Sequence, residues 1–542
     1  MDNMAQGPVR PGICSEVGEK QMTGQSAELL ARDFSLITDL VRAHAQERPE
    51  ARAVVHKDRS LTYAQFDAEI DRVAATLQQA GLTVGDRIAV CAMSSIPYAV
   101  TFLGALRAGV VVTPLAPSST REQLQGMVAD SGARIFFVDM PITGQLGPFD
   151  WFGGQLVALD DAAPGKPWSS WLAAEGARPA PVEIPPATPF NIIYSSGTTG
   201  LPKGIVQSHR MRWAHVQRGA NFGYGPDSIT IVSTPLYSNT TLVSFLPTLT
   251  LGGTVVLMEK FDAHGLLELA QRERATHAML VPVQYKRIMA LPDFDSFDLS
   301  SFVMKFCTSA PFHADIKADV LKRWPGGLIE FYGMTEGGGG CSLAAHLFPD
   351  KLHTVGRPNE GHTILLLDDN GQAVGPGEIG EIVGHSPTAV MNEYHNQPGK
   401  TQEAEWIHPD GRRFIRTGDV GRFDEDGFLT LMDRKKDMII TGGFNVYPSD
   451  IEALLHAHPD LTDVAVVGVP SDAWGETPVA FVVAAPGKTV QGADIRAWAN
   501  ERLGKVQRIA DVVVTDALPR SAIGKILKRE LRDGWVAQQP AA

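Results

Sequence analysis

The segment 189–204 contains the residue types that bind phosphate groups. It reads PFNIIYSSGTTGLPKG, in which an apolar, β-prone run at 192–194 leads into hydroxyl side chains, three glycines and a lysine. Glycines let the backbone turn and bring its N–H groups close to an anion, and hydroxyl and ammonium groups add further donors. The pattern predicts a strand followed by a loop that holds the phosphates of a nucleotide; a flexible linker, the alternative, rarely follows a buried strand. The residues expected at the phosphates are Ser195, Ser196, Gly197, Thr198, Thr199, Gly200 and Lys203.

This loop differs from two common nucleotide-binding patterns. A P-loop ends in Gly-Lys-Ser/Thr, but Lys203 lies between Pro202 and Gly204. The G-x-G-x-x-G pattern at 375–380 leads into the β-prone run 381–383, which is typical of a strand and not of a helix. We therefore predict a hairpin turn at 375–380 and no dinucleotide site there.

Three further segments carry residues suited to phosphoryl chemistry. Glu336 ends the sequence FYGMTE, Asp419 ends RTGD, and Lys525 lies in PRSAIGKI. A carboxylate can hold Mg²⁺ beside phosphates or accept hydrogen bonds from a ribose, and a lysine on a loop can bring positive charge to a reacting phosphate. Taken singly, each has a plainer explanation, because Thr-Glu often starts a helix, Gly-Asp often makes a turn, and a C-terminal lysine is usually solvated.

Together, the four motifs resemble those of the adenylate-forming superfamily, in its acyl-CoA and aryl-CoA synthetase branch of AMP-dependent synthetases and ligases. The matching segments run from about Leu61 to Lys528, which is nearly the whole chain. The resemblance implies an enzyme that uses ATP to activate a carboxylic acid as an acyl-adenylate. It further implies that the acyl group then passes to the thiol of CoA.

The resemblance also implies roles for individual residues. The expected catalytic residues are Lys525, Thr335, Glu336 and Lys203, with Glu336 as the Mg²⁺ ligand. Lys436 falls at the hinge about which a small C-terminal domain would rotate between the two half-reactions. The residues expected to bind the rest of ATP and CoA are Tyr332 at adenine, Asp419 and Arg434 at ribose, and Gly443 and Trp474 at CoA.

The segments that line the acyl pocket in this superfamily correspond to 237–245, 308–311 and 337–341. They contain no Asp, Glu, Lys or Arg, so an α-amino acid, whose buried ammonium would need a carboxylate, is a poor candidate substrate. The glycines at 337–340 remove side-chain bulk, which favours an apolar aryl or medium- to long-chain acid. The sequence departs from the family pattern at Ser238, where histidine is common, and at 308–311 and 505–508. The predicted pocket residues are Tyr237, Ser238, Asn239, Ser309, Ala310, Gly337, Gly338 and Gly339.

Alternating helical and strand patterns from residue 34 onward predict parallel sheets covered by helices. We expect an α/β N-terminal domain at 29–435, a small α+β C-terminal domain at 436–542, and a disordered tail at 1–28. The Pro- and Ala-rich stretch 163–188 is predicted to connect two subdomains. A capping box is expected from Ser449 to Glu452 at the start of a helix in the small domain, which also has a helix predicted at 495–503.

Composition limits the partners and the cell compartment. The formal charge of −13 argues against a nucleic acid or an anionic membrane as the main partner. The four cysteines show no metal-binding or disulfide spacing, and neither a membrane span nor a secretory segment is evident, so we expect a cytoplasmic protein. The oligomeric state, monomer or homodimer, stays open.

The sequence therefore predicts an acid–CoA ligase that requires ATP, Mg²⁺ and CoA. One rival keeps the acyl-adenylate but transfers the acyl group to an amine or to a carrier-protein thiol. Another is a nucleotide-binding protein that has lost catalysis, against which the presence of Lys203, Glu336, Asp419, Arg434 and Lys525 counts.

Overall fold

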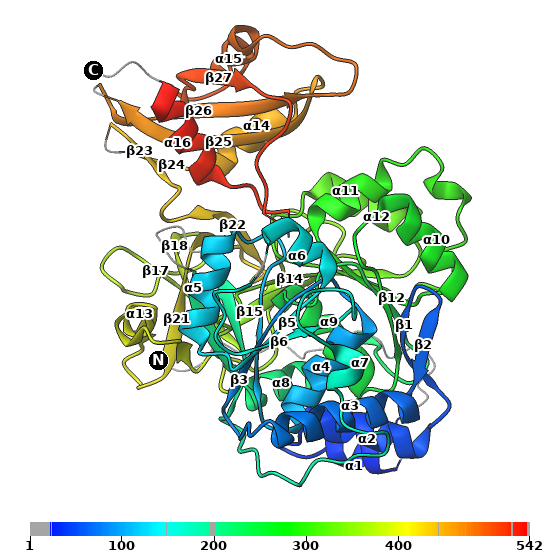
Figure 1. Cartoon of the computed structure of the whole chain (residues 1–542). Helices are drawn as coiled ribbons and strands as arrows, with labels where there is room; N and C mark the ends of the chain where they lie inside the picture. The colour runs from blue at the N-terminus through cyan, green and yellow to red at the C-terminus, as the bar shows by residue number, and fades with distance from the viewer. Residues whose placement is uncertain are drawn as a thin grey trace. The chain divides into compact units, whose positions relative to one another are not determined.

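The computed structural model describes Met22 and residues 24–147, 149–195, 202–442, 444–471, 473–521 and 524–538. Their fold forms two compact units (Figure 1). The first unit comprises residues 1–352 and 386–403, and the second comprises 353–385 and 404–542. Within the described residues, no helix combines the length and the hydropathy needed to cross a membrane.

One sheet of the first unit is built mainly from parallel strands. Its strand order is β15-β14-β13-β12-β10-β11-β1-β2, and only the pairs β14/β15 and β1/β2 are antiparallel. Short Val-, Ile- and Leu-rich strands suit a sheet that is covered on both faces. The strands are β1 (Arg52–His56), β2 (Arg59–Thr62), β10 (Ile229–Val232), β11 (Thr254–Leu257), β12 (His277–Leu280), β13 (Met304–Cys307), β14 (Gly327–Gly333) and β15 (Gly340–Ala344).

The other sheet of this unit has the order β19-β9-β8-β4-β3-β5-β6-β7. Its centre is parallel, whereas β8, β9 and β19 form an antiparallel edge. The strands are β3 (Arg87–Cys91), β4 (Val111–Pro114), β5 (Ile135–Val138), β6 (Gln155–Ala158), β7 (Lys166–Pro167), β8 (Pro189–Ser195), β9 (Lys203–Ser208) and β19 (Glu393–Tyr394).

The helices of the first unit share a continuous apolar core with both sheets. Buried side chains of α2, α3, α4, α8 and α9 pack with Val54 and Val232 of the first sheet and with Val90 and Phe190 of the second. The helices are α1 (Gln25–Leu30), α2 (Ile37–Glu47), α3 (Tyr63–Gln79), α4 (Ile96–Arg107), α5 (Arg121–Ser131), α6 (Met140–Leu146), α7 (Trp168–Trp171), α8 (His209–Gly219), α9 (Asn239–Thr250), α10 (Ala263–Glu273), α11 (Pro282–Met289), α12 (Ala314–Arg323) and α13 (Pro398–Glu403).

The second unit begins with an antiparallel sheet of order β17-β18-β21-β20, in which β22 also pairs with β21. The turn before β18 contains the pattern 375–380, which confirms the predicted hairpin. Lys436 lies between β22 and β23, inside this unit, and the predicted domain boundary at 435/436 stays a prediction. The strands of this sheet are β17 (Thr363–Leu367), β18 (Ile379–His385), β20 (Glu405–Ile407), β21 (Arg413–Phe423) and β22 (Leu429–Arg434), and the short strand β16 (Arg357–Pro358) precedes the sheet without belonging to it.

The chain from β23 onward, orange to red in Figure 1, has a sheet of order β24-β23-β26-β25, with β27 parallel to β26. Buried residues of α14 and α15 share one apolar cluster with this sheet, and Leu531 of α16 shares another. The α/β first unit and this α+β segment confirm the predicted fold class. The elements are β23 (Ile439–Thr441), β24 (Phe444–Val446), α14 (Pro448–His456), β25 (Leu461–Ser471), β26 (Gly475–Ala484), α15 (Gly492–Asn500), β27 (Asp511–Val514) and α16 (Lys528–Gln538).

Two predictions about chain segments in the first unit were wrong. The stretch 163–188 does not join two subdomains, because it runs from β7 to β8 of the same sheet. The expected tail at 1–28 is wrong for residues 25–28, because α1 begins at Gln25, and residues 1–21 and 23 lie outside the described residues. In α1 the buried hydroxyl of Ser26 donates to a Glu47 carboxylate oxygen at 2.7 Å, so a polar anchor fixes this part of the segment.

The predicted capping box in the second unit was also wrong. Pro448 occupies the first turn of α14, so the helix starts before Ser449 and is preceded by Tyr447. The Glu452 carboxylate instead accepts a hydrogen bond from the backbone N–H of Val466 at 2.7 Å. The helix predicted at 495–503 exists but begins and ends three residues earlier, at Gly492 and Asn500.

Two helical glycines allow a test of the packing between α3 and α4. A Cβ atom on Gly104 of α4 would meet Val73 of α3 at 2.5 Å, whereas one on Gly144 of α6 would meet no heavy atom within 4 Å. We expect Gly104→Ala to lower the free energy of unfolding by about 1–3 kcal/mol because it overpacks the core. Gly144→Ala should raise it by up to about 1 kcal/mol through helix propensity. Urea denaturation measures both, and effects of the same sign would contradict this packing.

Candidate active site

The predicted acyl-pocket segments of the first unit gather at one edge of its first sheet. The strands β10, β12, β13 and β14 are parallel neighbours, so their carboxyl ends lie at the same edge. The segment 237–239 follows β10, 308–311 follows β13, and 334–339 follows β14. Ligands of α/β sheets bind at such carboxyl ends. The topology therefore brings together segments that are about one hundred residues apart in the sequence.

The β8–β9 hairpin places both ends of the predicted phosphate loop opposite each other, since Ser195 pairs with Lys203 in the antiparallel register. The expected strand before the loop is thus confirmed as β8. Five of the predicted phosphate-contacting residues lie outside the described residues. They are Ser196, Gly197, Thr198, Thr199 and Gly200.

A buried polar network holds this hairpin. Asn191 of β8 donates to the Gln207 side-chain oxygen of β9 at 2.9 Å, and the fully buried guanidinium of Arg212 donates to both side chains. Its two bonds to the Asn191 oxygen measure 3.1 and 3.2 Å. Burial lowers the pKa of Arg212 to about 9. A cation buried against neutral amides is costly unless it is well bonded, so these partners fix its position.

The same network reaches two other predicted site segments. The Gln207 side-chain amide donates to the backbone oxygen of Thr335 at 2.5 Å. It also lies 3.5 Å from the side-chain oxygen of Asn239, the first residue of α9. Residues of β8, β9, α8, α9 and the loop after β14 are thus joined through one amide, which sets the position of Thr335 relative to the hairpin.

Glu336 is held next to Lys203 through a tyrosine. The Tyr394 hydroxyl donates to a Glu336 carboxylate oxygen at 2.8 Å, and the Lys203 ammonium lies 4.7 Å from the centre of the Tyr394 ring. The second Glu336 oxygen has no hydrogen-bond partner in the described part of the chain. The same residues also contain no group of three or more His, Cys, Asp or Glu side chains that could hold a metal ion by itself. One carboxylate with an available oxygen fits Mg²⁺, which proteins commonly hold through one or two carboxylates together with substrate phosphates.

The other predicted acyl-pocket residues are mainly uncharged and partly buried. Burial raises the pKa of the Tyr237 hydroxyl to about 12, so this side chain stays neutral at physiological pH. Ser238 is buried, and Ala310 is partly buried in the loop after β13. Ser309, in the same loop, adopts a φ of 86°, a backbone conformation that residues other than glycine rarely adopt.

The glycines after β14 have a reason that the sequence interpretation missed. Gly337, Gly338 and Gly339 have φ values of 69°, 81° and 132°, a region that favours glycine. A Cβ atom on Gly337 would also lie 2.3 Å from the backbone oxygen of Ala389. The backbone conformation therefore accounts for these glycines, and their effect on the size of an acyl pocket stays a prediction.

The second unit brings together the two residues predicted at the ribose. Asp419 of β21 pairs in register with Arg434 of β22, and Arg434 Nε lies 3.2 Å from an Asp419 carboxylate oxygen. Gly418 before it has a φ of 69°, and the Thr417 hydroxyl accepts a hydrogen bond from the Asp419 backbone N–H at 3.0 Å. These contacts hold the Asp419 carboxylate of β21 in a fixed orientation.

Lys525 lies close to this pair. Burial and the positive charge of Arg434 lower the pKa of Lys525 to about 8, while the Asp419 carboxylate opposes that shift. Arg520 donates to the backbone oxygen of Gly524 at 2.7 Å and to the Asp463 carboxylate at 2.5 Å. This anchors the residue before Lys525 to β25.

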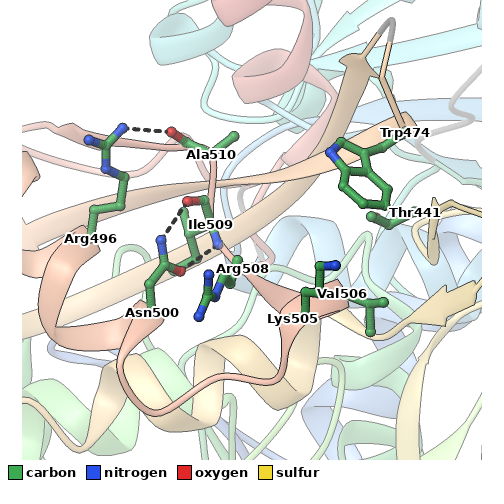
Figure 2. Close-up of a pocket in the computed structure, with 9 residues that line it drawn as sticks. All are labelled: Thr441, Trp474, Arg496, Asn500, Lys505, Val506, Arg508, Ile509 and Ala510. Atoms are coloured by element: carbon green, nitrogen blue, oxygen red, sulfur yellow. Dashed lines mark hydrogen bonds between the residues drawn. The ribbon is translucent and has the colours of Figure 1, made fainter.

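A cavity of about 440 Å³ opens in the second unit beside Trp474, whose indole is 45% exposed. Figure 2 shows Trp474 and Thr441 at one end, Arg496 and Asn500 at the other, and Lys505 and Arg508 between them. Arg496 donates to the Ala510 backbone oxygen at 2.9 Å. Neither Lys505 nor Arg508 pairs with an acidic side chain of the described residues. Gly443, predicted beside this region, lies outside those residues.

The sequence interpretation missed several residues that shape the site. Asn191 interrupts an apolar strand, which is a readable signal for a buried polar contact, but its partners Gln207 and Arg212 are identified only by the fold. Tyr394 is distant in the sequence from Glu336, which it contacts, and Arg508 is distant from Trp474, with which it lines the cavity.

Comparisons with known proteins agree with this geometry. The AMP-binding enzyme family model matches residues 41–395, and the model of the AMP-binding enzyme C-terminal domain matches 450–525. A feruloyl-CoA synthase from Amycolatopsis sp is 35% identical over 502 residues, covering 90% of this chain and 96% of that protein. A fatty acid–[acyl-carrier-protein] ligase, ScoC, from Streptomyces coeruleorubidus is 32% identical over 509 residues, covering 90% and 94%.

Among solved structures, ATP-bound MatB from Rhodopseudomonas palustris superimposes with a TM-score of 0.81 at 29% identity. The match covers 92% of this chain and 99% of that one. The fold, together with the matches to both family models, defines an adenylate-forming enzyme built from two units. The chain belongs to the AMP-binding enzyme family, in its acyl-CoA and aryl-CoA synthetase branch.

Two arginines of α8 test the buried network. Arg212→Met leaves the buried Asn191 oxygen without its two donors, so we expect the free energy of unfolding to fall by about 1–3 kcal/mol. Arg210, two residues away, makes a partly exposed pair with Asp33 at 3.1 Å, so Arg210→Met should cost less than about 1 kcal/mol. Chemical denaturation compares them, and equal effects would show that the network does not stabilise the hairpin.

Proposed function

We propose that this protein is an AMP-forming carboxylic acid–CoA ligase that requires ATP and Mg²⁺. The observation that carries the proposal is the position of Lys525 beside the Asp419–Arg434 pair. If Asp419 binds the ribose, a cation within electrostatic range of its carboxylate can act on the phosphate attached to that ribose. Membership of the AMP-binding enzyme family supports the same reaction class.

In the first half-reaction, a carboxylate oxygen of the acid attacks the α-phosphorus of ATP and the bond to pyrophosphate breaks. Asp419 accepts hydrogen bonds from the ribose hydroxyls, Tyr332 packs against adenine, and Lys203 with the hydroxyl-rich loop binds phosphate oxygens. Lys525 neutralises charge that builds up on the α-phosphate and the attacking carboxylate. A lysine with a pKa of about 8 remains mostly protonated at neutral pH, as this role requires.

Mg²⁺ would be held by Glu336, whose carboxylate Tyr394 orients. The ion supplies positive charge to the phosphate oxygens when it is bound. Thr335 precedes Glu336 in the sequence, and the Gln207 amide fixes the position of the Thr335 backbone. The contribution of the chain is therefore orientation: Gln207, Tyr394 and Lys203 keep the carboxylate, the phosphate loop and the reacting groups in register.

In the second half-reaction, the thiol of CoA attacks the acyl carbon and AMP leaves. The cavity beside Trp474 has the chemistry to hold the nucleotide end of CoA, because an aromatic face can stack on adenine and Lys505 and Arg508 can pair with phosphates. Rotation about Lys436, between β22 and β23, would exchange Lys525 for the CoA-binding segment.

The acid is proposed to be apolar, either aryl or medium- to long-chain, since the predicted pocket segments contain no charged side chain. The two relatives are named for a feruloyl and a fatty acyl group, and both groups fall within these classes. A cytoplasmic location is part of the proposal, because Cys91, Cys307 and Cys341 are buried and unpaired.

A carrier-protein thiol is the second candidate acceptor. The similarity to an acyl-carrier-protein ligase favours it, as do the exposed apolar side chains of Ile440, Phe444 and Trp474, which a protein partner could cover. The cavity argues for CoA, since a carrier delivers its phosphopantetheine without an adenine nucleotide. Transfer to an amine has no comparable structural support.

The decisive assay is a panel of aryl, branched and linear acids with ATP and Mg²⁺. We expect pyrophosphate release to depend on an apolar acid, and AMP release to depend on that acid together with CoA. AMP release with a loaded carrier protein or an amine in place of CoA would identify another acceptor. Absence of acid-dependent pyrophosphate exchange would instead indicate a protein without this catalysis.

The CoA cavity can be tested with two arginines of one segment. Arg508→Ala removes a cavity cation, and we expect the KM for CoA to rise about tenfold or more while the KM for ATP changes little. Arg502 stacks on Trp498 at 4.5 Å and does not line the cavity, so Arg502→Ala serves as the matched control. Steady-state kinetics with varied CoA measure the effect, and equal KM values for both variants would remove the cavity from the account.

A further inference from the structure

A strained serine is held by a hydroxyl contact between two of the predicted acyl-pocket segments. The Ser309 hydroxyl lies 2.5 Å from that of Thr240, which is buried in the first turn of α9. We call this pair the hydroxyl clasp. Ser309 lies in the loop between β13 and α12, and its φ of 86° lies in the region that favours glycine.

The strain points to a function for the Ser309 side chain. A glycine would adopt this backbone conformation without cost, whereas a serine keeps it only where its surroundings enforce it. Such outliers concentrate at ligand sites, where the strain serves positioning. Here the described contact that offsets the strain is the bond to Thr240, which ties the segment after β10 to the segment after β13.

The clasp also adjoins the buried network of the catalytic residues. Asn239, immediately before Thr240, lies 3.5 Å from the Gln207 amide that binds the Thr335 backbone oxygen. The first turn of α9 is therefore tethered on one side to the phosphate hairpin and on the other to Ser309. A change in the clasp would move a wall of the acyl pocket without removing a group from the nucleotide site.

We propose that the Ser309–Thr240 clasp is a specificity determinant that limits the bulk of the acid that is adenylated. The proposal rests on the proposed function and refines its substrate class. The Ser309 hydroxymethyl and the Thr240 methyl occupy space at the carboxyl edge of the sheet, and their hydrogen bond fixes the separation of the two segments. Loosening the clasp lets the segments separate and admits bulkier acids.

The test measures acid-dependent pyrophosphate release without CoA, for graded series of linear and aryl acids. Ser309→Gly removes the side chain, and Thr240→Val removes a hydroxyl at nearly constant volume. Both variants should shift the kcat/KM ratio of a bulkier acid to the best wild-type acid by about tenfold, which is the discrimination that one methylene group gives. Thr248→Val is the matched control. Thr248 lies on the same helix as Thr240, and the substitution breaks its buried 2.8 Å hydrogen bond to Thr230 of β10, remote from the clasp, so it should leave the ratio unchanged.

Thermal unfolding supplies a readout that does not depend on activity. Ser309→Ala loses the hydroxyl but keeps the strained backbone, so its midpoint should lie below that of Ser309→Gly. If Thr240→Val ranks the acids as the wild-type protein does, or if Thr248→Val shifts the kcat/KM ratio by the same amount, the clasp does not determine specificity. The ligase proposal would still stand. Equal unfolding midpoints for the two Ser309 variants would show that the backbone at residue 309 is not strained, which removes the strain argument for the clasp. No adenylation of any acid by the wild-type protein would refute the proposed function, and the clasp with it.

Discussion

The buried guanidinium of Arg212 is the constraint on which the geometry of the first unit depends. It has no carboxylate partner among the described residues, and the side-chain oxygens of Asn191 and Gln207 accept its hydrogen bonds. Because a buried cation cannot remain unbonded, both amides must face it. Gln207 then has its amide group left to bind the Thr335 backbone. One buried charge beside the β8–β9 hairpin thus helps to set the position of the loop after β14.

A similar logic applies in the second unit, where function needs a charge that can move. Lys525 follows Gly524, whose backbone oxygen accepts a hydrogen bond from Arg520, and Arg520 also donates to the Asp463 carboxylate of β25. The Asp419–Arg434 pair contains the carboxylate that we propose binds the sugar hydroxyls, and it contains a cation whose charge lowers the pKa of Lys525. In the proposed reaction, Lys525 would act in one half-reaction and leave the site in the other, which requires the segment that carries it to move.

The motifs and the fold class could be predicted from the sequence because they are local. Lys203, Glu336, Asp419 and Lys525 lie in short glycine-containing segments of the sequence, and the alternation of apolar runs predicts the sheets. Pairing across the fold could not be predicted: Arg212 and Gln207 contact Asn191 and Thr335 only because β8, β9 and β14 are brought together. The start of α14 was misjudged because Pro448, which suits the first turn, begins the helix before Ser449. The glycines 337–339 were interpreted as space, whereas their positive φ values reflect the backbone path.

The most direct test of the account separates the two half-reactions in Lys525→Ala. The rate of acyl-adenylate formation from ATP and an accepted acid should fall about 10²-fold or more, as expected when a charge that stabilises the transition state is removed. Thioester formation from a synthetic acyl-adenylate and CoA should proceed close to the wild-type rate, because Lys525 is not needed for that step. A loss of equal size in both half-reactions, or no loss in the first, would contradict the central claim that this lysine acts only while the acid is being activated.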